Sequence, residues 1–291
     1  MNKTIQTFSL VRVNHWVKNL VVFLPLFFSG DLFSAIHTSK FTEVVMLGLA
    51  FCFAASTIYI LNDFVDIESD KLHPEKSGRP LASGIFSKKQ AFFIALFTLA
   101  ATVFFVSRLG FSARYVIGYF LLNIAYSLWL KKISIVDVTC IGIGFVLRII
   151  GGGIAAGVFV SHWMIIITFL LSISIAFAKR RDDLVISIDG KHDFSRKGYS
   201  LAFIDIAKSI SFSITLVAYI MYSISESVIE RIGSDKLYIT SLFVFLGIMR
   251  YLQISIVEKK SGSPLTILKS DVFLRISIVL WFLSFSFIIY G

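Results

Sequence analysis

Charged residues are scarce in this chain. They make up 16% of its 291 residues, whereas their share in a typical soluble domain is about a quarter. Hydrophobic residues make up 56%, and the mean hydropathy is strongly positive. A water-soluble domain built around one apolar core is therefore excluded.

Cysteine and histidine are also scarce, and their placement excludes two kinds of site. The two cysteines, Cys52 and Cys140, lie inside apolar runs. They are too few for a disulfide framework or a cysteine-based metal cluster, so we interpret them as packing residues. His73, His162 and His192 are scattered without the short spacing that metal ligands have.

Long apolar runs are what the sequence contains in abundance. A helix needs about 20 residues to cross a hydrocarbon core of about 30 Å. The runs do not alternate in polarity, which favours helices over a β-barrel, because a helix satisfies its own backbone hydrogen bonds in lipid. We predict an all-α, multi-pass membrane protein with about nine transmembrane helices. The predicted spans are residues 17–32, 41–61, 90–106, 115–130, 133–158, 163–178, 201–223, 237–257 and 272–290.

The basic residues predict the orientation in the membrane. With the N-terminus on the cytoplasmic side, most of the 28 lysines and arginines flank the cytoplasmic ends of the spans. The two long charged connections, residues 64–89 and 179–200, then face the cytoplasm, and we expect them to form the active-site loops. No small-residue cleavage site follows the first run, so we expect that run to be retained as a span. Topology and anionic lipid explain the net charge of +10, and we expect no nucleic-acid binding.

Acidic residues gather at the end of the second predicted span. Asp63, Asp66 and Asp70 are three and four residues apart, so on a helix they share one face, with Asn62 beside them. A solvated helix end balanced by nearby lysines is the simpler interpretation. Carboxylates at a membrane interface are costly, however, and are often functional. We therefore interpret the cluster as functional.

Hard carboxylate oxygens suit Mg²⁺, which proteins hold with one or two carboxylates together with substrate phosphates and water. The expected ligand is therefore a magnesium-bound diphosphate. Lys76 and Arg79 follow in a basic turn, and the planar guanidinium group of Arg79 can donate two parallel hydrogen bonds to a phosphate. Metal site and phosphate-binding cations are thus predicted on one loop.

The motif Asn62-Asp-x-x-Asp-x-x-x-Asp70 at this position resembles that of the UbiA superfamily of intramembrane prenyltransferases, and the resemblance covers nearly the whole chain. It implies a single transmembrane domain over residues 1–291, with the helices bundled around a central cavity that opens to the cytoplasmic side. It also implies a location in the bacterial cytoplasmic (inner) membrane.

Further segments resemble one branch of the superfamily, the decaprenyl-phosphate phosphoribosyltransferases, in order and in spacing. These segments are Arg12-x-x-x-Trp16-Val-Lys18-Asn19, Asn62 to Asp70 continued by His73-Pro-x-Lys76-x-x-Arg79-Pro, Tyr126-Ser-x-x-Leu-Lys131, Asp137, Arg148-x-x-Gly-Gly-Gly153, Lys179-Arg180-x-x-Asp183-Leu, Arg196-Lys197 and Arg250-Tyr251.

This resemblance implies a Mg²⁺-dependent phosphoribosyltransferase. A phosphate oxygen of a polyprenyl phosphate would attack the anomeric carbon of phosphoribosyl diphosphate and release diphosphate, for cell-envelope glycan synthesis. Asn62, Asp63 and Asp66 would hold Mg²⁺, and Asp63, Asp66 and Asp70 would be the catalytic carboxylates. The implied substrate-binding residues are Lys18, Tyr59, Asn62, Lys76, Arg79, Tyr126, Lys131, Asp137, Arg148, Lys179, Arg180, Asp183 and Arg196.

Several roles stay open at this point. Arg148 lies inside a predicted span, where an unpaired guanidinium is costly, so we expect it to face a polar cavity and to pair with a carboxylate or a ligand phosphate. Asp137, about three helical turns earlier, is either its electrostatic neighbour or an acceptor for a ribose hydroxyl. Tyr59 and Tyr126 either line the cavity or serve packing. The glycines at 151–153 favour close helix packing or a bend over a phosphate loop.

The acceptor and the oligomeric state are open as well. Decaprenyl and undecaprenyl phosphate both suit the pattern, membrane lipid is an expected partner, and a homo-oligomer is compatible with the sequence.

An aromatic prenyltransferase of the same superfamily is the alternative function. Such an enzyme transfers a prenyl group from its diphosphate to a ring such as 4-hydroxybenzoate, and it usually carries a second motif, D-x-x-x-D, after the sixth span. Here the basic run of residues 179–181, followed by Asp182 and Asp183, takes that place. Extra cations suit a donor with more phosphate groups. Whether Asp182 and Asp183, or Asp189 and Asp193, hold a second metal stays open.

A transporter that uses Asp63, Asp66 and Arg148 as an ion path is a third hypothesis. Transport sites lie near the middle of the membrane, whereas these carboxylates stand at one predicted cytoplasmic end. The sequence therefore favours an enzyme.

Overall fold

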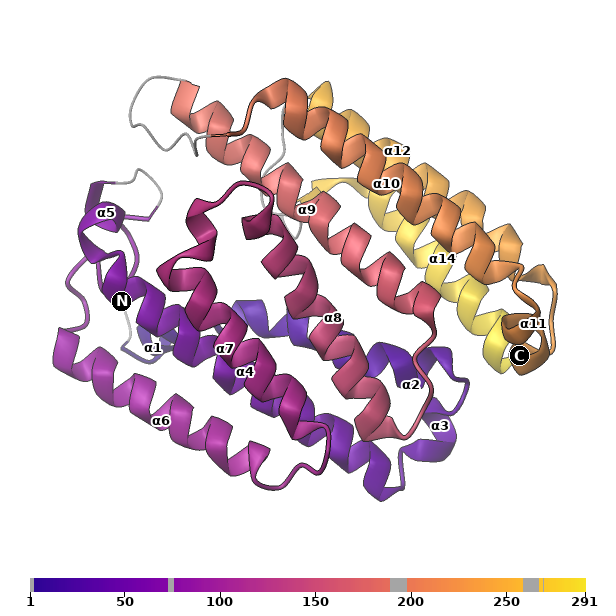
Figure 1. The fold of residues 1–291 in the computed structure, drawn as a ribbon, viewed down its shortest axis with the longest axis horizontal. Coiled ribbons are helices and arrows are strands. Elements are labelled where there is room, and N and C mark those ends of the chain that lie inside the picture. The colour runs from indigo at the N-terminus through magenta and orange to yellow at the C-terminus, as the bar shows by residue number, and fades with distance from the viewer. Residues whose placement is uncertain (1–2, 73–75, 189–197, 259–266, 269) are drawn as a thin grey trace. The chain divides into compact units, whose positions relative to one another are not determined.

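A computed structural model describes residues 3–72, 76–188, 198–258, 267–268 and 270–291. Every regular element in this part of the chain is a helix, which confirms the predicted all-α fold (Figure 1). Helix starts have local causes. Ser87 and Gln90 form a capping box at the start of α6, and Ser200 accepts a hydrogen bond from the Phe203 amide at the start of α10.

Seven helices in the described residues are long and apolar enough to cross a membrane. They correspond to seven of the nine predicted spans. They are α4 (Ser39–Val65), α6 (Lys88–Val106), α8 (Val136–Ala156), α9 (His162–Ile188), α10 (Leu201–Ser223), α12 (Ser241–Ile256) with the preceding 3₁₀ helix η3 (Lys236–Thr240), and α14 (Val272–Tyr290).

The other two predicted spans are shorter helices. The first is the 3₁₀ helix η1 (Val13–Phe23) continued by α2 (Leu24–Phe28), and the other is α7 (Ala113–Leu128), which has 16 residues. The total of nine spans therefore stays a prediction. The remaining short elements are α1 (Lys3–Val11), α3 (Leu32–Ala35), α5 (Ile67–Leu72), η2 (Leu130–Lys132) and α11 (Glu226–Ile232).

The chain divides into two compact units, and α8 contributes to both. The first unit comprises residues 1–27, 31–130 and 147–159. In it α4 packs against α6, α7 and η1 (Figure 1). Small alanines on α4, such as Ala50 and Ala54, are fully buried beside Phe51 and let these helices approach closely. The predicted single domain over 1–291 stays a prediction.

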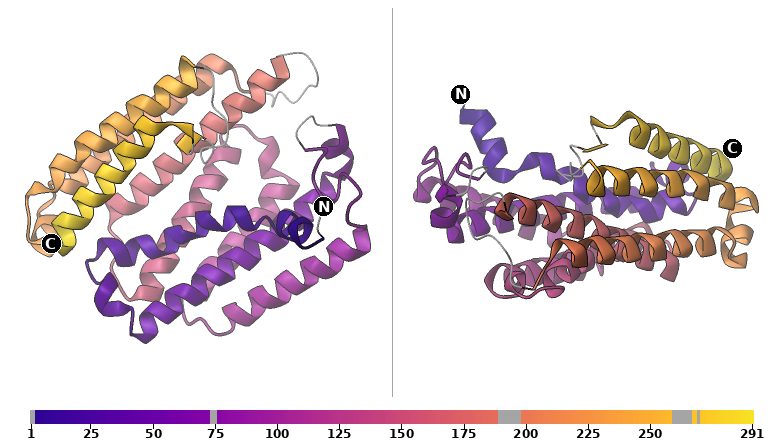
Figure 2. Two further views of the ribbon diagram at one scale, coloured as in Figure 1. Left: turned by 180° about the vertical axis from the view of Figure 1, so that it is seen from behind. Right: turned by 90° about the horizontal axis from the view of Figure 1, so that it is seen from above.

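The second unit comprises residues 28–30, 131–146 and 160–291. Here α9 packs along α10, and α12 packs along α14 (Figure 2). Its buried apolar residues form two clusters, one around Phe177 and Ile204 and the other around Phe212 and Leu274.

Both predicted active-site loops are partly helical. The connection at 64–89 contains α5, and α9 continues past the predicted end of its span at Ala178 as far as Ile188. The charged residues there support a helix outside the apolar segment, because Arg180 and Asp183 form an ion pair between successive turns at 3.0 Å. Lys179 to Asp183 therefore lie on a helix and not in a loop.

Gly152 of α8 lies directly against the backbone of η1. A Cβ atom at this position would lie 2.0 Å from the carbonyl oxygen of Val22, far inside any allowed contact. Only a hydrogen atom fits between the two backbones. This confirms that the glycine serves close helix packing and not a phosphate loop.

We expect Gly152→Ala to destabilise the protein, because the added methyl group must push η1 away from α8, at a cost of about 1–3 kcal/mol. Thermal unfolding in detergent measures the effect. Gly118→Ala in α7 is the matched control, since its Cβ would meet its nearest atom at 4.0 Å. Equal melting temperatures for the two variants would contradict the packing role of Gly152.

Candidate active site

The aspartate motif spans a break between two helices. Helix α4 ends at Val65, and Asp66 has φ −98° and ψ 9°. Its amide still donates to the Asn62 carbonyl at 2.9 Å, and the Asp70 amide donates to the Asp66 carbonyl at 2.8 Å. The predicted continuous helix through the three aspartates is therefore interrupted at Asp66.

Asp63 and Asp70 are nevertheless brought together by a shared cation. Both are buried, with 1% and 4% exposure. Arg79 Nη1 lies 3.2 Å from Asp63 Oδ1 and 2.6 Å from Asp70 Oδ2, and Arg12 Nη2 donates a second charged hydrogen bond to Asp63 Oδ1. The expected repulsion between the carboxylates is thus compensated by two guanidinium groups.

Arg12 reaches this site from the N-terminal segment, and it was absent from the predicted site residues. It joins α1 to η1 with a left-handed backbone, φ 54° and ψ 48°, and its guanidinium lies 4.7 Å from the centre of the Tyr59 ring. The segment is held on α4 by Ser56, which donates to the Val11 carbonyl at 2.8 Å and accepts from Trp16 Nε1 at 3.0 Å. The sequence feature that could have pointed to Arg12 as a site residue is the segment Arg12-x-x-x-Trp16.

The donor set of the motif fits a magnesium ion. Asn62 Oδ1 is buried and has no hydrogen-bond partner among the described residues. An amide oxygen without a hydrogen-bond partner is available to bind a hard cation. It stands next to the carboxylate of Asp63 in the sequence. Within the described residues, no three His, Cys, Asp or Glu side chains are grouped as a metal site. Such a group is not required, since Mg²⁺ takes one or two carboxylates and fills its shell with water and substrate oxygens.

Arg148 is buried, with 6% exposure, among aromatic and amide groups. Its Nε donates to Asn19 Oδ1 at 2.7 Å, and its guanidinium lies 4.2 Å from the Tyr119 ring centre and 5.2 Å from that of Phe51. Asn19 in turn donates to Cys52 Sγ at 3.2 Å. These contacts compensate part of the cost of burying the guanidinium, and the amide of Asn19 is a partner that the sequence did not predict.

Asp137 forms a second charged cluster, in the second unit. Its side chain has 0% exposure. Arg180 Nε donates to Asp137 Oδ2 at 2.7 Å, and the Tyr199 hydroxyl donates to Asp137 Oδ1 at 2.6 Å. Arg180 Nη1 also donates to Asp183 at 3.0 Å. Three of the predicted residues, Asp137, Arg180 and Asp183, are therefore brought together, and Tyr199 is a member that the sequence did not reveal.

A further buried network lies beside this cluster on α9 and α10. Arg181 Nε and Lys208 Nζ both donate to Asp205 Oδ1, at 2.9 and 3.0 Å, and Lys208 also donates to Ser255 Oγ at 2.7 Å. Lys208 has 0% exposure. The two neighbouring arginines of α9, Arg180 and Arg181, are thus each paired with a carboxylate on a different helix.

The remaining predicted residues stand in varied places. Lys18 and Lys179 are exposed, whereas Tyr59, Lys76, Tyr126 and Lys131 are half-buried. Arg196 and the Asp189–Asp193 pair lie outside the described residues. The binding roles of all these residues stay predictions.

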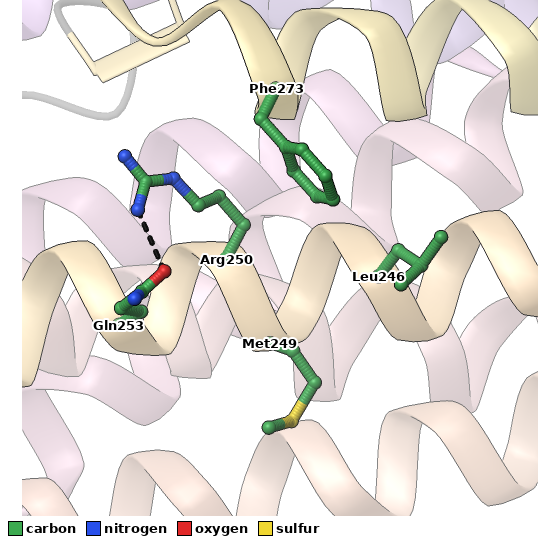
Figure 3. Close-up of a pocket in the computed structure, with 5 residues that line it drawn as sticks. All are labelled: Leu246, Met249, Arg250, Gln253 and Phe273. Carbon is green, nitrogen blue, oxygen red and sulfur yellow. Dashed lines mark hydrogen bonds between the residues drawn. The ribbon is translucent and has the colours of Figure 1, made fainter.

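A pocket of about 510 Å³ lies on α12 and α14, lined by Leu246, Met249, Arg250, Gln253 and Phe273 (Figure 3). The residues of the two aspartate clusters do not line it. Among the described residues that line it, Arg250 is the charged one, and it is bound to Asp271 at 2.6 Å and to Glu258 at 2.9 Å. None of the predicted catalytic or substrate-binding residues is among these five lining residues.

The Arg250–Asp271 ion pair predicts a pH-dependent stability. The hydrogen bond from Arg250 is the main cause that lowers the pKa of Asp271. A lowered carboxyl pKa contributes stability above the unfolded value of about 3.9, and this contribution is lost as the pH falls through the folded value. Asp271→Asn should therefore lower the melting temperature at pH 7, and this effect should become smaller as the pH is lowered from 7 to 3.

Melting temperatures in detergent between these pH values measure the difference. Asp235→Asn is the control, because Asp235 is exposed and makes no side-chain cap to its helix. A constant difference between wild type and Asp271→Asn at every pH would contradict the role of the ion pair.

Comparison with known proteins agrees with this architecture. The model of the UbiA prenyltransferase family matches residues 22–277. Decaprenyl-phosphate phosphoribosyltransferase of Corynebacterium glutamicum is 27% identical over 277 residues, 93% of this chain and 82% of the relative. The protein of the same name from Mycolicibacterium smegmatis is 27% identical over 281 residues, 93% of this chain and 88% of the relative.

A solved structure shares the fold. The UbiA homolog from Archaeoglobus fulgidus bound to GPP and Mg²⁺ has a TM-score of 0.69 and 17% identity, and the match covers 98% of this chain and 99% of that chain. Fold and site together define a multi-pass, all-α membrane transferase with buried carboxylate–guanidinium clusters. The chain belongs to the UbiA prenyltransferase family.

Proposed function

We propose that the protein transfers a 5-phosphoribosyl group from phosphoribosyl diphosphate to a polyprenyl phosphate, releases diphosphate and serves cell-envelope glycan synthesis. Relatives that carry the name decaprenyl-phosphate phosphoribosyltransferase support this proposal, since they match 93% of the chain. The acceptor is a decaprenyl or undecaprenyl phosphate.

One observation carries the choice of donor. At the start of the charged part of α9, where an aromatic prenyltransferase would present a second pair of aspartates, Arg180 and Arg181 are held in place by Asp137 and Asp205 at 2.7 and 2.9 Å. Asp183, one of the two neighbouring aspartates there, is bound to Arg180. Guanidinium groups held in place at this position suit a donor that carries a 5-phosphate in addition to its diphosphate.

The metal would be held by Asn62, Asp63 and Asp66, and when bound it supplies positive charge that stabilises the leaving diphosphate. Arg79, oriented by Asp70, and Arg12 donate hydrogen bonds toward the same diphosphate oxygens. Further phosphate contacts come from the cations Lys18, Lys76, Lys131, Arg148, Lys179, Arg180 and Arg196. Tyr59 and Tyr126 line the site.

The reaction itself needs no protein nucleophile. An oxygen of the lipid phosphate is already ionised at neutral pH, and it forms the new bond to the anomeric carbon of the ribose while the bond from that carbon to the diphosphate oxygen breaks. Asp137 either accepts a hydrogen bond from a ribose hydroxyl or acts only through Arg180. The chain contributes positioning and charge compensation.

The location follows from the substrates and the charge pattern. The lipid acceptor lies in the bacterial inner membrane, and the water-soluble donor is cytoplasmic. The N-terminus and the segments at 64–89 and 179–200 would therefore face the cytoplasm, as the distribution of basic residues also indicates. Membrane lipid is a partner, and a homo-oligomer is compatible with this arrangement.

Label transfer tests the reaction. Purified protein in detergent is incubated with Mg²⁺, undecaprenyl or decaprenyl phosphate, and phosphoribosyl diphosphate labelled in the ribose. We expect the label to move into the organic-soluble lipid fraction. Label that stays wholly water-soluble, with consumption of a prenyl diphosphate in a parallel incubation, would show an aromatic-type prenyltransferase instead.

Asp66→Asn tests the role of the aspartate motif. We expect it to reduce transfer roughly 100-fold or more and to raise the Mg²⁺ concentration needed for half-maximal rate, because one charged ligand oxygen is lost. Initial rates against Mg²⁺ concentration measure both effects. Glu68→Gln is the control, since Glu68 lies on the neighbouring helix α5 with 82% side-chain exposure and pairs only at the surface with Lys71. Similar rates for the two variants would contradict the assignment of Asp66 as a metal ligand.

A further inference from the structure

Tyr199 stands just before α10 and links two segments by its hydroxyl group. The oxygen accepts a hydrogen bond from the Ile135 amide at 2.7 Å and donates one to Asp137 Oδ1 at 2.6 Å. A phenol has a single proton, so its one donated bond goes to the carboxylate. The ring is held by edge contacts with Phe177 and a tilted contact with Phe203, with centres 6.2 and 6.0 Å away.

The two oxygens of Asp137 have different partners. Tyr199 occupies Oδ1, and Arg180 Nε occupies Oδ2 at 2.7 Å. A carboxylate rotates as one rigid plane, so a bond that fixes one oxygen also fixes the other. The hydroxyl of Tyr199 therefore determines the position of Asp137 Oδ2, and with it the orientation of the Arg180 guanidinium.

The backbone on both sides is bent into unusual conformations that permit these bonds. Ile135 has φ 70°, a value that a β-branched residue rarely adopts, and Gly198 has φ 100°. The positive φ favours a glycine at 198, and a Cβ atom there would also lie 2.4 Å from Ser134 Oγ, so the serine side chain would have to move. The strained backbone at Ile135 indicates that the hydrogen bonds of the Tyr199 hydroxyl, which this conformation permits, are needed.

From this geometry we infer that Tyr199 is a positioning residue, which orients Asp137 so that Arg180 is held in one direction to bind a phosphate group of the donor. This inference rests on the proposed function. Burial, followed by the hydrogen bond to Asp137, raises the pKa of Tyr199 to about 12. The hydroxyl thus keeps its proton and stays a donor throughout the working range of pH.

Tyr199→Phe removes only the hydroxyl group, and Tyr219→Phe is its matched control. Tyr219 lies in the same unit and, like the half-buried Tyr199, makes two hydrogen bonds through its hydroxyl group, with Thr240 at 2.6 Å and from Trp281 Nε1 at 2.8 Å. Both variants should lose similar thermal stability. In the label-transfer assay only Tyr199→Phe should raise KM for phosphoribosyl diphosphate, by about tenfold, with a smaller change in kcat.

The outcomes separate this inference from the proposed function. If wild type transfers label and the two variants share the wild-type KM, the inference is overturned and the function stands. If wild type transfers no label, the function fails, and a double-mutant cycle of Tyr199→Phe with Arg180→Gln on thermal stability decides instead. A non-additive cycle supports the link through Asp137, and an additive cycle overturns it.

Discussion

Charge compensation inside an apolar helical protein is the constraint on which the rest of this structure depends. A carboxylate removed from water costs several kcal/mol unless a partner of opposite charge accompanies it. Asp63 and Asp70 meet this requirement with arginines of other segments, and so do Asp137 and Asp205. Two of these pairs, Arg12 with Asp63 and Arg180 with Asp137, join elements that are distant in the sequence. The interactions that make burial tolerable therefore also hold the helices and the N-terminal segment in place.

These pairs explain how the site can be both stable and reactive. The guanidinium groups satisfy the carboxylates. On the proposed function, an incoming magnesium diphosphate brings its own cation for the aspartates and its own oxygens for the arginines, so both sets of groups exchange partners. The site then needs little rearrangement to bind a highly charged donor, because the donors and acceptors are already held in position.

The sequence predicted those parts of the fold that depend on local composition. Continuous apolar runs indicated the long helices such as α4 and α14, because a single segment in lipid satisfies its backbone hydrogen bonds by forming a helix. The sequence did not reveal the 3₁₀ conformation of η1, because apolar composition does not distinguish it from an α-helix. Nor did it reveal the break at Asp66, where three- and four-residue spacing predicted one unbroken face.

By itself, the sequence determined the class of fold and the chemical character of the site. Composition requires membrane helices, and the motif from Asn62 to Asp70 requires cations nearby. The tertiary structure shows which partners these charges have: Arg12 and Arg79 are the cations at Asp63, and at Asp137 the cation Arg180 is joined by the neutral hydroxyl of Tyr199. The physical reason is that hydropathy and charge are properties of single residues, whereas the partner of a buried charge depends on which distant segments the packing brings within hydrogen-bonding distance.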